Sequence, residues 1–195
     1  MKIYFIRHTT PNIEPGICYG QADIDVTSSF THESEKILST LQQGENTDNY
    51  EYIFTSPAKR CYKLARKIQQ QHKNSTQLFT RQELLEVNFG DWELRAWNDI
   101  PRTESQTWMG DFINQRPPNG ESLLELQDRV QHFLTELIAM NFDNAIVCTH
   151  AGVMRLIAAQ YLNIPLSEIF TIKLDYGQIM LLEKHLNSLN LQLSV

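Results

Sequence analysis

Three short apolar runs in this chain each end abruptly in polar residues. The runs are residues 3–6, 52–54 and 145–148, and they are followed by Arg7-His8, by Ser56 through Arg60, and by Thr149-His150. Continuous apolar runs of this length are typical of strands that are covered by helices on both faces. Helical periodicity between the runs therefore predicts an α/β fold: a three-layer sandwich with a mostly parallel central sheet flanked by helices.

Four stretches between and after these runs have the apolar spacing of amphipathic helices. They are residues 30–44, 58–68, 122–140 and 153–162, the last of which is ended by Asn163 and Pro165. Ser56 and Pro57 are predicted to begin the second of these helices, as N-cap and first helical residue. Ser122, followed three residues later by Glu125, predicts a capping box at the start of the third.

The remaining segments are a long loop, a cap region and three further strands. Residues 9–26 contain prolines and glycines without a helical period, and long ordered loops of this kind are often functional. Strands are expected at residues 77–80, 169–174 and 178–182, with a Tyr176-Gly177 turn before the last. Residues 84–120 mix tryptophans, glycines and prolines, which favours short helices and loops that form a lid or cap. The length of 195 residues predicts a single domain over 1–195.

The charge balance excludes several classes of partner. Seventeen basic and twenty-three acidic residues give a net charge of −6, so no global field attracts nucleic acid or an anionic membrane. The apolar stretches are far shorter than the roughly 20 residues that cross a bilayer, and the N-terminus lacks the pattern of a signal peptide, so a cytoplasmic location is expected. Cys18, Cys61 and Cys148 form no CxxC pair, which favours buried thiols over disulfides or a zinc site.

The polar residues after the strands indicate the chemistry. Ligands bind beyond the carboxyl ends of strands in open α/β sheets, so Arg7, His8, Arg60 and His150 are expected to converge. Arginine forks match the oxygens of a phosphate, and the helix that begins near Ala151 adds a positive dipole end. A neutral imidazole is a nucleophile toward phosphorus. One histidine is therefore expected to take the phosphoryl group of a small phosphate ester, and the other to donate to the transferring oxygens.

Five blocks, in order, resemble the histidine phosphatase (phosphoglycerate mutase-like) superfamily. They are Arg7-His8-Thr9, Ser56-Pro57-x-x-Arg60, Glu86-x-x-Phe89-Gly90-Asp91-Trp92-Glu93, Gly120-Glu121-Ser122 and Thr149-His150-Ala151-Gly152. Thr9 stands where many members have glycine. The resemblance implies a phosphoglycerate mutase-like fold and a phosphatase that uses neither metal nor cofactor. In this sequence it implies that His8 is the phosphorylated nucleophile, that Arg7 and Arg60 clamp the phosphate, and that His150 is the second histidine of the phosphate pocket.

Glu86 resembles the proton donor of the superfamily, with Asp91 and Glu93 as alternatives. Within the superfamily, Thr9-Thr10-Pro11 and residues 16–23 resemble the branch of α-ribazole phosphatases. The implied reaction is hydrolysis of α-ribazole 5′-phosphate to α-ribazole during assembly of the cobalamin nucleotide loop. Tyr19 is expected to bind the substrate, and its ring, like those of Trp92 and Trp97, is expected either to stack on a ring of the substrate or to pack in the core and lid.

Other functions stay open at this point. The main alternative is a broad-specificity small-molecule histidine phosphatase, followed by a phosphoglycerate mutase and by a non-catalytic phosphate-binding module. A metal-dependent hydrolase would use His8, His150 and a carboxylate such as Asp91. The sequence contains neither the HxH nor the HExxH spacing that would favour such a metal site.

Overall fold

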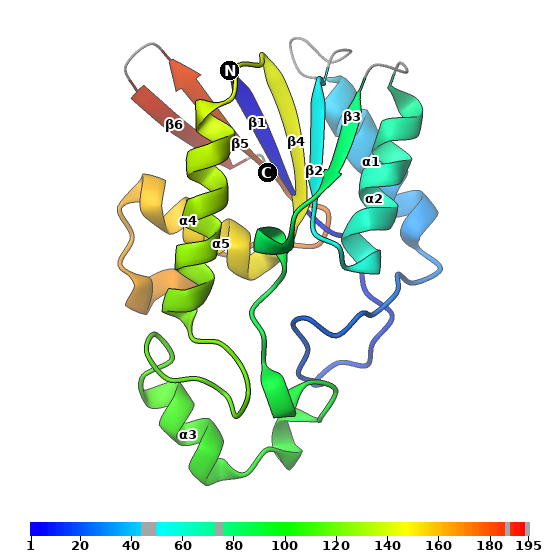
Figure 1. The fold of residues 1–195 in the computed structure, drawn as a ribbon. Helices are drawn as coiled ribbons and strands as arrows, with labels where there is room; N and C mark the ends of the chain where they lie inside the picture. The colour runs from blue at the N-terminus through cyan, green and yellow to red at the C-terminus, as the bar shows by residue number, and fades with distance from the viewer. Residues whose placement is uncertain (44–49, 73–75, 186–187, 194–195) are drawn as a thin grey trace.

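The computed structural model describes residues 1–43, 50–72, 76–185 and 188–193. Within these ranges six strands form one mixed sheet in the order β3-β2-β4-β1-β5-β6 (Figure 1). The strands are β1 Lys2–Arg7, β2 Tyr52–Thr55, β3 Gln77–Thr80, β4 Asn144–Thr149, β5 Ile179–His185 and β6 Ser188–Leu193. Strands β1 to β4 are mutually parallel, whereas β5 runs antiparallel to β1 and β6 antiparallel to β5. The carboxyl ends of the four parallel strands therefore meet at one edge.

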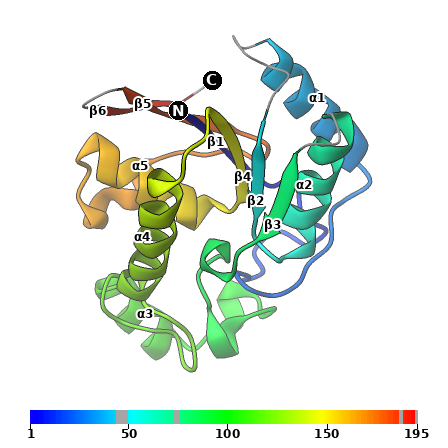
Figure 2. The same ribbon diagram turned by 45° about the horizontal axis from the view of Figure 1, so that its top comes forward.

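Helices cover both faces of this sheet (Figure 2). They are α1 Phe30–Gln42, α2 Lys59–Gln71, α4 Leu123–Ala139 and α5 Ala151–Leu162, with α3 Arg102–Gly110 beyond the sheet. Side chains alternate along each strand, so Ile6 and Ile146 pack with α1 and α2, while Phe5 and Val147 pack with α4 and α5. The predicted three-layer α/β sandwich is confirmed.

Two predicted helix boundaries agree with the structure and one does not. The capping box of Ser122 and Glu125 is present at the start of α4, and Asn163 ends α5 with φ of +54°. The prediction that Ser56 caps α2 is wrong, because α2 begins at Lys59 after the extended residue Ala58. The first predicted helix ends at Gln42, and its expected end at residue 44 lies outside the described residues.

The carboxyl-terminal part of the sheet differs from the sequence prediction. Residues 169–174 are not a strand: the 3-10 helix Leu166–Thr171 occupies the first half of this segment. Ile169 and Ile172 are both buried because they lie three residues apart on one face of this turn. On the side of β5 away from β1, the neighbouring strand is β6, which was not predicted from the sequence. The Tyr176-Gly177 turn is present, with Gly177 at φ of +73°.

Short helices and loops fill the region between β3 and α4, as predicted. The 3-10 helices are Gln82–Leu84, Gly90–Trp92 and Trp97–Asp99, and α3 follows them. Figure 1 shows this region beyond the carboxyl ends of the parallel strands. Helix α3 has no buried residue, whereas Trp92 is buried with Cys18 and Ile100 in a small separate core. No helix among the described residues has both the length and the apolar character needed to span a membrane.

Candidate active site

The structure brings His8 and His150 together at the carboxyl edge of the sheet. Each follows directly on a strand, and β1 and β4 are neighbours whose last residues, Arg7 and Thr149, are paired. The centroids of the two imidazole rings are 5.1 Å apart. Both rings are buried, with exposed fractions of 2% for His8 and 0% for His150. Strand register thus fixes the spacing of the two histidines.

His8 is held in one tautomer. Its Nδ1 lies 2.7 Å from the carbonyl oxygen of Thr9, which can only accept a hydrogen bond, so Nδ1 carries the proton. Burial, followed by the positive charge of Arg60, lowers the pKa of His8 to about 3, and Arg7 acts in the same direction. The ring is therefore neutral at physiological pH, with an unprotonated Nε2 that suits it to nucleophilic attack.

Arg7 and Arg60 flank the two histidines without an acidic partner. Arg60 is fully buried, and it donates to the carbonyl oxygens of Gly20 at 2.6 Å and Ala22 at 2.9 Å. Arg7 donates to the carbonyl of Leu174 at 2.6 Å. Neither arginine forms a salt bridge within the described ranges, and the buried Nε of each lacks a hydrogen-bond partner there. Two unpaired guanidinium groups are suited to an anion.

His150 uses both of its ring nitrogens on protein groups. Arg60 donates to Nδ1 at 3.3 Å, so the proton of the neutral ring lies on Nε2, which donates to the Ser56 hydroxyl at 2.8 Å. Burial lowers the pKa of His150, and the positive charge of Arg60 lowers it further. Ser56, which the sequence predicted to be a helix cap, thus contacts His150, and no feature of the sequence links the two residues.

Of the three candidate proton donors, Glu86 is the one that lines the cavity beside His8. Its Oε2 accepts the backbone N–H of Gly152 at 3.0 Å, in the first turn of α5. A side chain at position 152 would clash, since a Cβ built there would lie 2.1 Å from Glu86 Oε1. Glycine is therefore required for this contact.

Asp91 and Glu93 have other roles in the structure. Glu93 accepts backbone hydrogen bonds from Gly20, Gln21, Ala22 and Phe89, at 2.8 to 3.1 Å, and so ties residues 20–22 to the cap region. Asp91 is exposed and accepts from Asn119 at 2.9 Å. Neither carboxylate lines the cavity.

The cavity has a volume of about 600 Å³ and joins a polar end to an aromatic end. Arg7, His8, Glu86 and His150 lie at the polar end. The aromatic residues that line the cavity are Tyr19, Phe89, Trp97, Trp108, Phe112 and Phe170. From Phe89 through Trp108 and Phe112 to Phe170, successive ring centroids lie 5.0 to 6.3 Å apart. The structure therefore places Tyr19 and Trp97 against the cavity, but Trp92 is a core residue.

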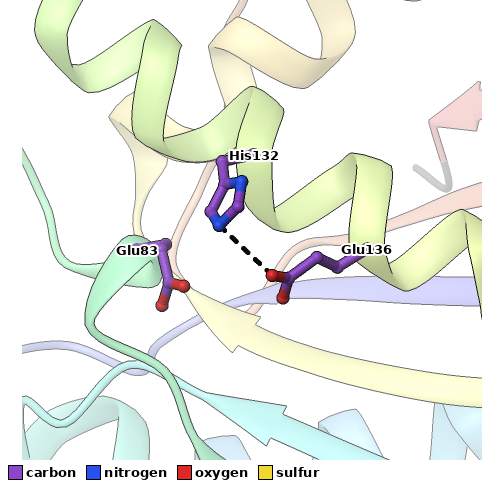
Figure 3. A group of neighbouring side chains, drawn as sticks. All are labelled: Glu83, His132 and Glu136. Atoms are coloured by element: carbon purple, nitrogen blue, oxygen red, sulfur yellow. Dashed lines mark ion pairs between the residues drawn. The ribbon is translucent and has the colours of Figure 1, made fainter.

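A possible metal-ligand cluster lies elsewhere. Within the described part of the chain, one group of three acidic or histidine side chains has ligand spacing: Glu83, His132 and Glu136 (Figure 3). Arg81 donates to both carboxylates of this group, so their negative charge is already paired. The hypothetical set of His8, His150 and Asp91 does not form such a cluster.

Comparisons with known proteins agree with this site. Residues 3–194 match the family model of the histidine phosphatase superfamily, branch 1. An adenosylcobalamin/alpha-ribazole phosphatase of Escherichia coli K12 is 28% identical over 183 residues, covering 91% of this chain and 87% of that protein. Phosphoserine phosphatase 1 of Hydrogenobacter thermophilus is 22% identical, covering 90% and 82%. The chain therefore belongs to the histidine phosphatase superfamily and is a phosphatase.

The fold is likewise shared with solved structures. The alpha-ribazole phosphatase of Shigella flexneri superimposes with a TM-score of 0.87 at 22% identity, over 99% of this chain and 95% of that one. At this identity the similarity concerns the fold alone. It confirms the phosphoglycerate mutase-like arrangement expected from the sequence.

Proposed function

We propose that this chain hydrolyses a small phosphate monoester through a phosphohistidine at His8. The observation that supports this most directly is the state of the His8 ring, which is neutral, fixed with its proton on Nδ1, and placed among guanidinium groups without acidic partners. The positive charge that binds the phosphate also keeps the imidazole unprotonated. One arrangement thus provides both the binding site and the nucleophile.

The first half-reaction transfers the phosphoryl group. The Nε2 lone pair of His8 forms the new bond to phosphorus while the bond from phosphorus to the ester oxygen breaks. Arg7 and Arg60 donate hydrogen bonds to the phosphoryl oxygens, where charge is concentrated in the transition state. Glu86, in its protonated form, donates its proton to the departing oxygen, so the leaving group departs as an alcohol.

The second half-reaction returns the enzyme to its starting state. The Glu86 carboxylate accepts a proton from water as the water oxygen bonds to phosphorus, and the bond from phosphorus to His8 breaks. Phosphate leaves, Glu86 is again an acid, and the Nε2 lone pair of His8 is restored. The Gly152 N–H on Glu86 Oε2 holds the carboxyl group in place through both steps.

For the substrate we propose α-ribazole 5′-phosphate. The aromatic end of the cavity offers stacking surface for a flat heterocycle, and a volume of about 600 Å³ lies in the range of sites that enclose a small ligand. Relatives named adenosylcobalamin/alpha-ribazole phosphatase are among those similar to the chain, at 28% and 25% identity. The alternative is a broad-specificity phosphatase, because contacts between apolar surfaces are not directional.

We further propose that the chain acts as one domain in which residues 84–120 form a cap over the leaving group. Seven cavity-lining residues come from this segment: Glu86, Val87, Phe89, Trp97, Trp108, Met109 and Phe112. Helix α3 within it has no fully buried residue, and its Trp108 packs against the small core around Trp92. Closure of such a segment would exclude water from the first half-reaction.

Steady-state kinetics on two esters test the substrate proposal. A phosphate site clamps the group common to all esters, so discrimination must come from contacts with the leaving group. We expect kcat/KM for α-ribazole 5′-phosphate to exceed that for 3-phosphoglycerate by at least about tenfold, or roughly 1.4 kcal/mol of transition-state binding. Hydrolysis should predominate over phosphoryl transfer to a second alcohol. Comparable values for the two esters and for simple sugar phosphates would reject the specific substrate in favour of the broad phosphatase.

A further inference from the structure

Tyr176, which precedes β5, lies against the phosphate arginine Arg7. The Arg7 guanidinium carbon is 3.9 Å from the centroid of the Tyr176 ring, within the range of a cation–π interaction. On another side Arg7 Nη1 donates to the carbonyl of Leu174, in the same segment as Tyr176. These two contacts orient the guanidinium, whose Nε has no protein partner within the described ranges.

The backbone next to Tyr176 is hydrogen-bonded to the backbone of Arg7 and His8. The N–H of Gly177 lies 3.1 Å from the carbonyl oxygen of Arg7 and 3.2 Å from that of His8. Gly177 adopts a positive φ of 73°, a conformation that favours glycine. The turn therefore carries Tyr176 to a fixed place beside the nucleophile, with the Tyr176 and His8 rings 5.6 Å apart between centroids.

Tyr176 also forms a hydrogen bond with Tyr19, a residue that lies beside Arg60. Its hydroxyl lies 2.9 Å from that of Tyr19, which is 157 positions away in the sequence. The Tyr19 ring in turn lies 5.5 Å from the guanidinium carbon of Arg60. Arg60 donates to the carbonyl of Gly20, next to Tyr19. The tyrosine pair thus connects the two arginines that flank His8.

The tyrosine pair has one more hydroxyl proton than its own hydrogen bond uses. Each tyrosine hydroxyl has one proton to donate, and the single hydrogen bond between them uses one of the two. Burial raises the pKa of Tyr19, and the bond with Tyr176 raises it further, so Tyr19 stays a protonated donor. Tyr19 lines the cavity that contains His8. If Tyr176 donates to Tyr19, the Tyr19 proton is left for an acceptor in the cavity.

We infer that Tyr176 is a positioning residue of the phosphate site: its ring orients Arg7, and its hydroxyl orients Tyr19 to donate to a phosphate oxygen. This inference rests on the proposed function, because it takes the ligand between Arg7 and Arg60 to be a phosphoryl group. It assigns separate roles to the ring and the hydroxyl of one side chain. One substitution that removes the hydroxyl and another that removes the ring together with it therefore test the inference.

The hydroxyl is tested with Tyr176→Phe, and the ring is tested by comparing Tyr176→Leu with Tyr176→Phe. The probes are inorganic phosphate, with affinity measured by calorimetry, and p-nitrophenyl phosphate, with kcat and KM measured separately. We expect Tyr176→Leu to weaken phosphate binding and kcat/KM by about tenfold, the scale of a lost cation–π contact, and Tyr176→Phe to remain within about threefold. Tyr62→Leu, a change of similar exposure on α2, serves as the control that leaves both values unchanged.

Double variants separate positioning from general damage to the fold. In an Arg7→Ala background Tyr176→Leu should cost no more than Tyr176→Phe does, because the guanidinium that the ring orients is gone. In a Tyr19→Phe background Tyr176→Phe should cost nothing further, because the hydroxyl has lost its partner. Additive losses in both backgrounds, or a Tyr176→Leu protein that binds phosphate as tightly as Tyr62→Leu does, would overturn the inference. If Tyr176→Leu does not fold, the inference is tested by Tyr176→Phe, alone and in the Tyr19→Phe background. A wild type that binds phosphate but forms no phosphohistidine would reject the proposed function while these binding results stood.

Discussion

The polar and aromatic ends of the cavity are built in opposite ways. At the polar end His8 and His150 come directly after strands, and Arg60, which contacts His150, lies just beyond a third strand. All three side chains are at most 2% exposed and have defined hydrogen-bond partners. At the aromatic end Met109 and Phe170 are 67% and 56% exposed and come from short helices outside the sheet. On the proposed function, residues positioned by the sheet would bind the phosphoryl group that all phosphate esters share, and residues outside the sheet would contact the leaving group that distinguishes them.

The two ends also differ in what holds them in place. The spacing of His8 and His150 follows from six paired residues between β1 and β4. The aromatic wall is held by ring contacts, each of which contributes about 0.5–1.5 kcal/mol beyond the burial of area. Substitutions at the polar end should therefore change the chemical step, and substitutions at the aromatic end should change the choice of ester.

The largest effect is expected for His8→Ala. Loss of the nucleophile should lower kcat for every ester by a factor on the order of 10⁴ or more, as in other enzymes that lose the nucleophile. Rapid-quench labelling with a radioactive ester should give acid-labile, base-stable phosphate on the wild type only. His132→Ala, on the exposed face of α4, is the matched control and should label normally. Equal labelling of the His8→Ala protein would place the phosphoryl group elsewhere.

Arg60→Ala should lower kcat by roughly 10²-fold or more, since loss of one preorganised donor to developing charge costs about 3 kcal/mol. Arg60→Lys should recover only part of the rate, because an ammonium lacks the fork that bonds both Gly20 and Ala22. Arg66→Ala, an exposed change on the same helix, controls for the loss of a positive charge. A loss below about threefold at Arg60 would show that the polar end does not need this guanidinium.

Glu86→Gln should separate esters by their leaving groups. An alkoxide needs a proton from an acid whereas nitrophenolate leaves largely unaided, so we expect about 10²-fold loss on a sugar phosphate and much less on p-nitrophenyl phosphate. Asp91→Asn, a carboxylate outside the cavity, should leave both rates unchanged. Equal losses on the two esters would indicate that Glu86 acts by holding the first turn of α5. No loss on either would remove it as the proton donor.

Phe170→Ala tests the aromatic end. We expect about a tenfold lower kcat/KM for α-ribazole 5′-phosphate, equivalent to roughly 1.4 kcal/mol of lost ring contact, with little change for 3-phosphoglycerate. The melting temperature should barely move because the side chain is already 56% exposed. Leu162→Ala, at the exposed end of α5, provides the control for apolar truncation. If kcat/KM falls equally for both esters, the two ends of the cavity do not have separate roles.

The smallest effect is expected from removal of metal ions. Guanidinium and imidazole groups take the role that a metal has in other phosphatases, so dialysis against EDTA should leave kcat within about 1.5-fold of its starting value. Adding Mg²⁺ or Zn²⁺ to the dialysed protein should restore nothing. A loss of activity that a divalent ion restores would instead favour the metal-dependent alternative.

The strand ends could be predicted from the sequence because apolar runs and the polar residues after them are adjacent in the chain. His8 and His150 were found in this way, and the order of the sheet then brings them together. The segment 169–174 was misread because Ile169, Ile172 and Leu174 are apolar at spacings that suit either a strand or a tight helix. Strand β6 lacks a continuous apolar run, so this signal did not reveal it.

Contacts between distant loops could not be predicted. Glu86, Asp91 and Glu93 are three carboxylates within one short stretch of sequence. Only the fold shows that the Glu93 carboxylate accepts hydrogen bonds from four backbone amides. Ser56 precedes a proline, as a helix cap often does, yet α2 begins at Lys59, two residues later than predicted. The Ser56 hydroxyl instead forms a hydrogen bond with His150. Tyr176 offers no signal of its own, since its partners Arg7 and Tyr19 lie more than 150 positions away.

The reversed direction of β5 has a consequence for how this architecture can diversify. Ile179, at the start of β5, pairs with Ile6, near the end of β1, so the chain entering β5 arrives where the parallel strands finish. A parallel strand in that place would deliver its entry turn to the far side of the molecule. One inverted strand thus gives the reaction centre an additional contributing segment, whose residues can be exchanged during evolution without altering the four parallel strands or the crossover helices that connect them.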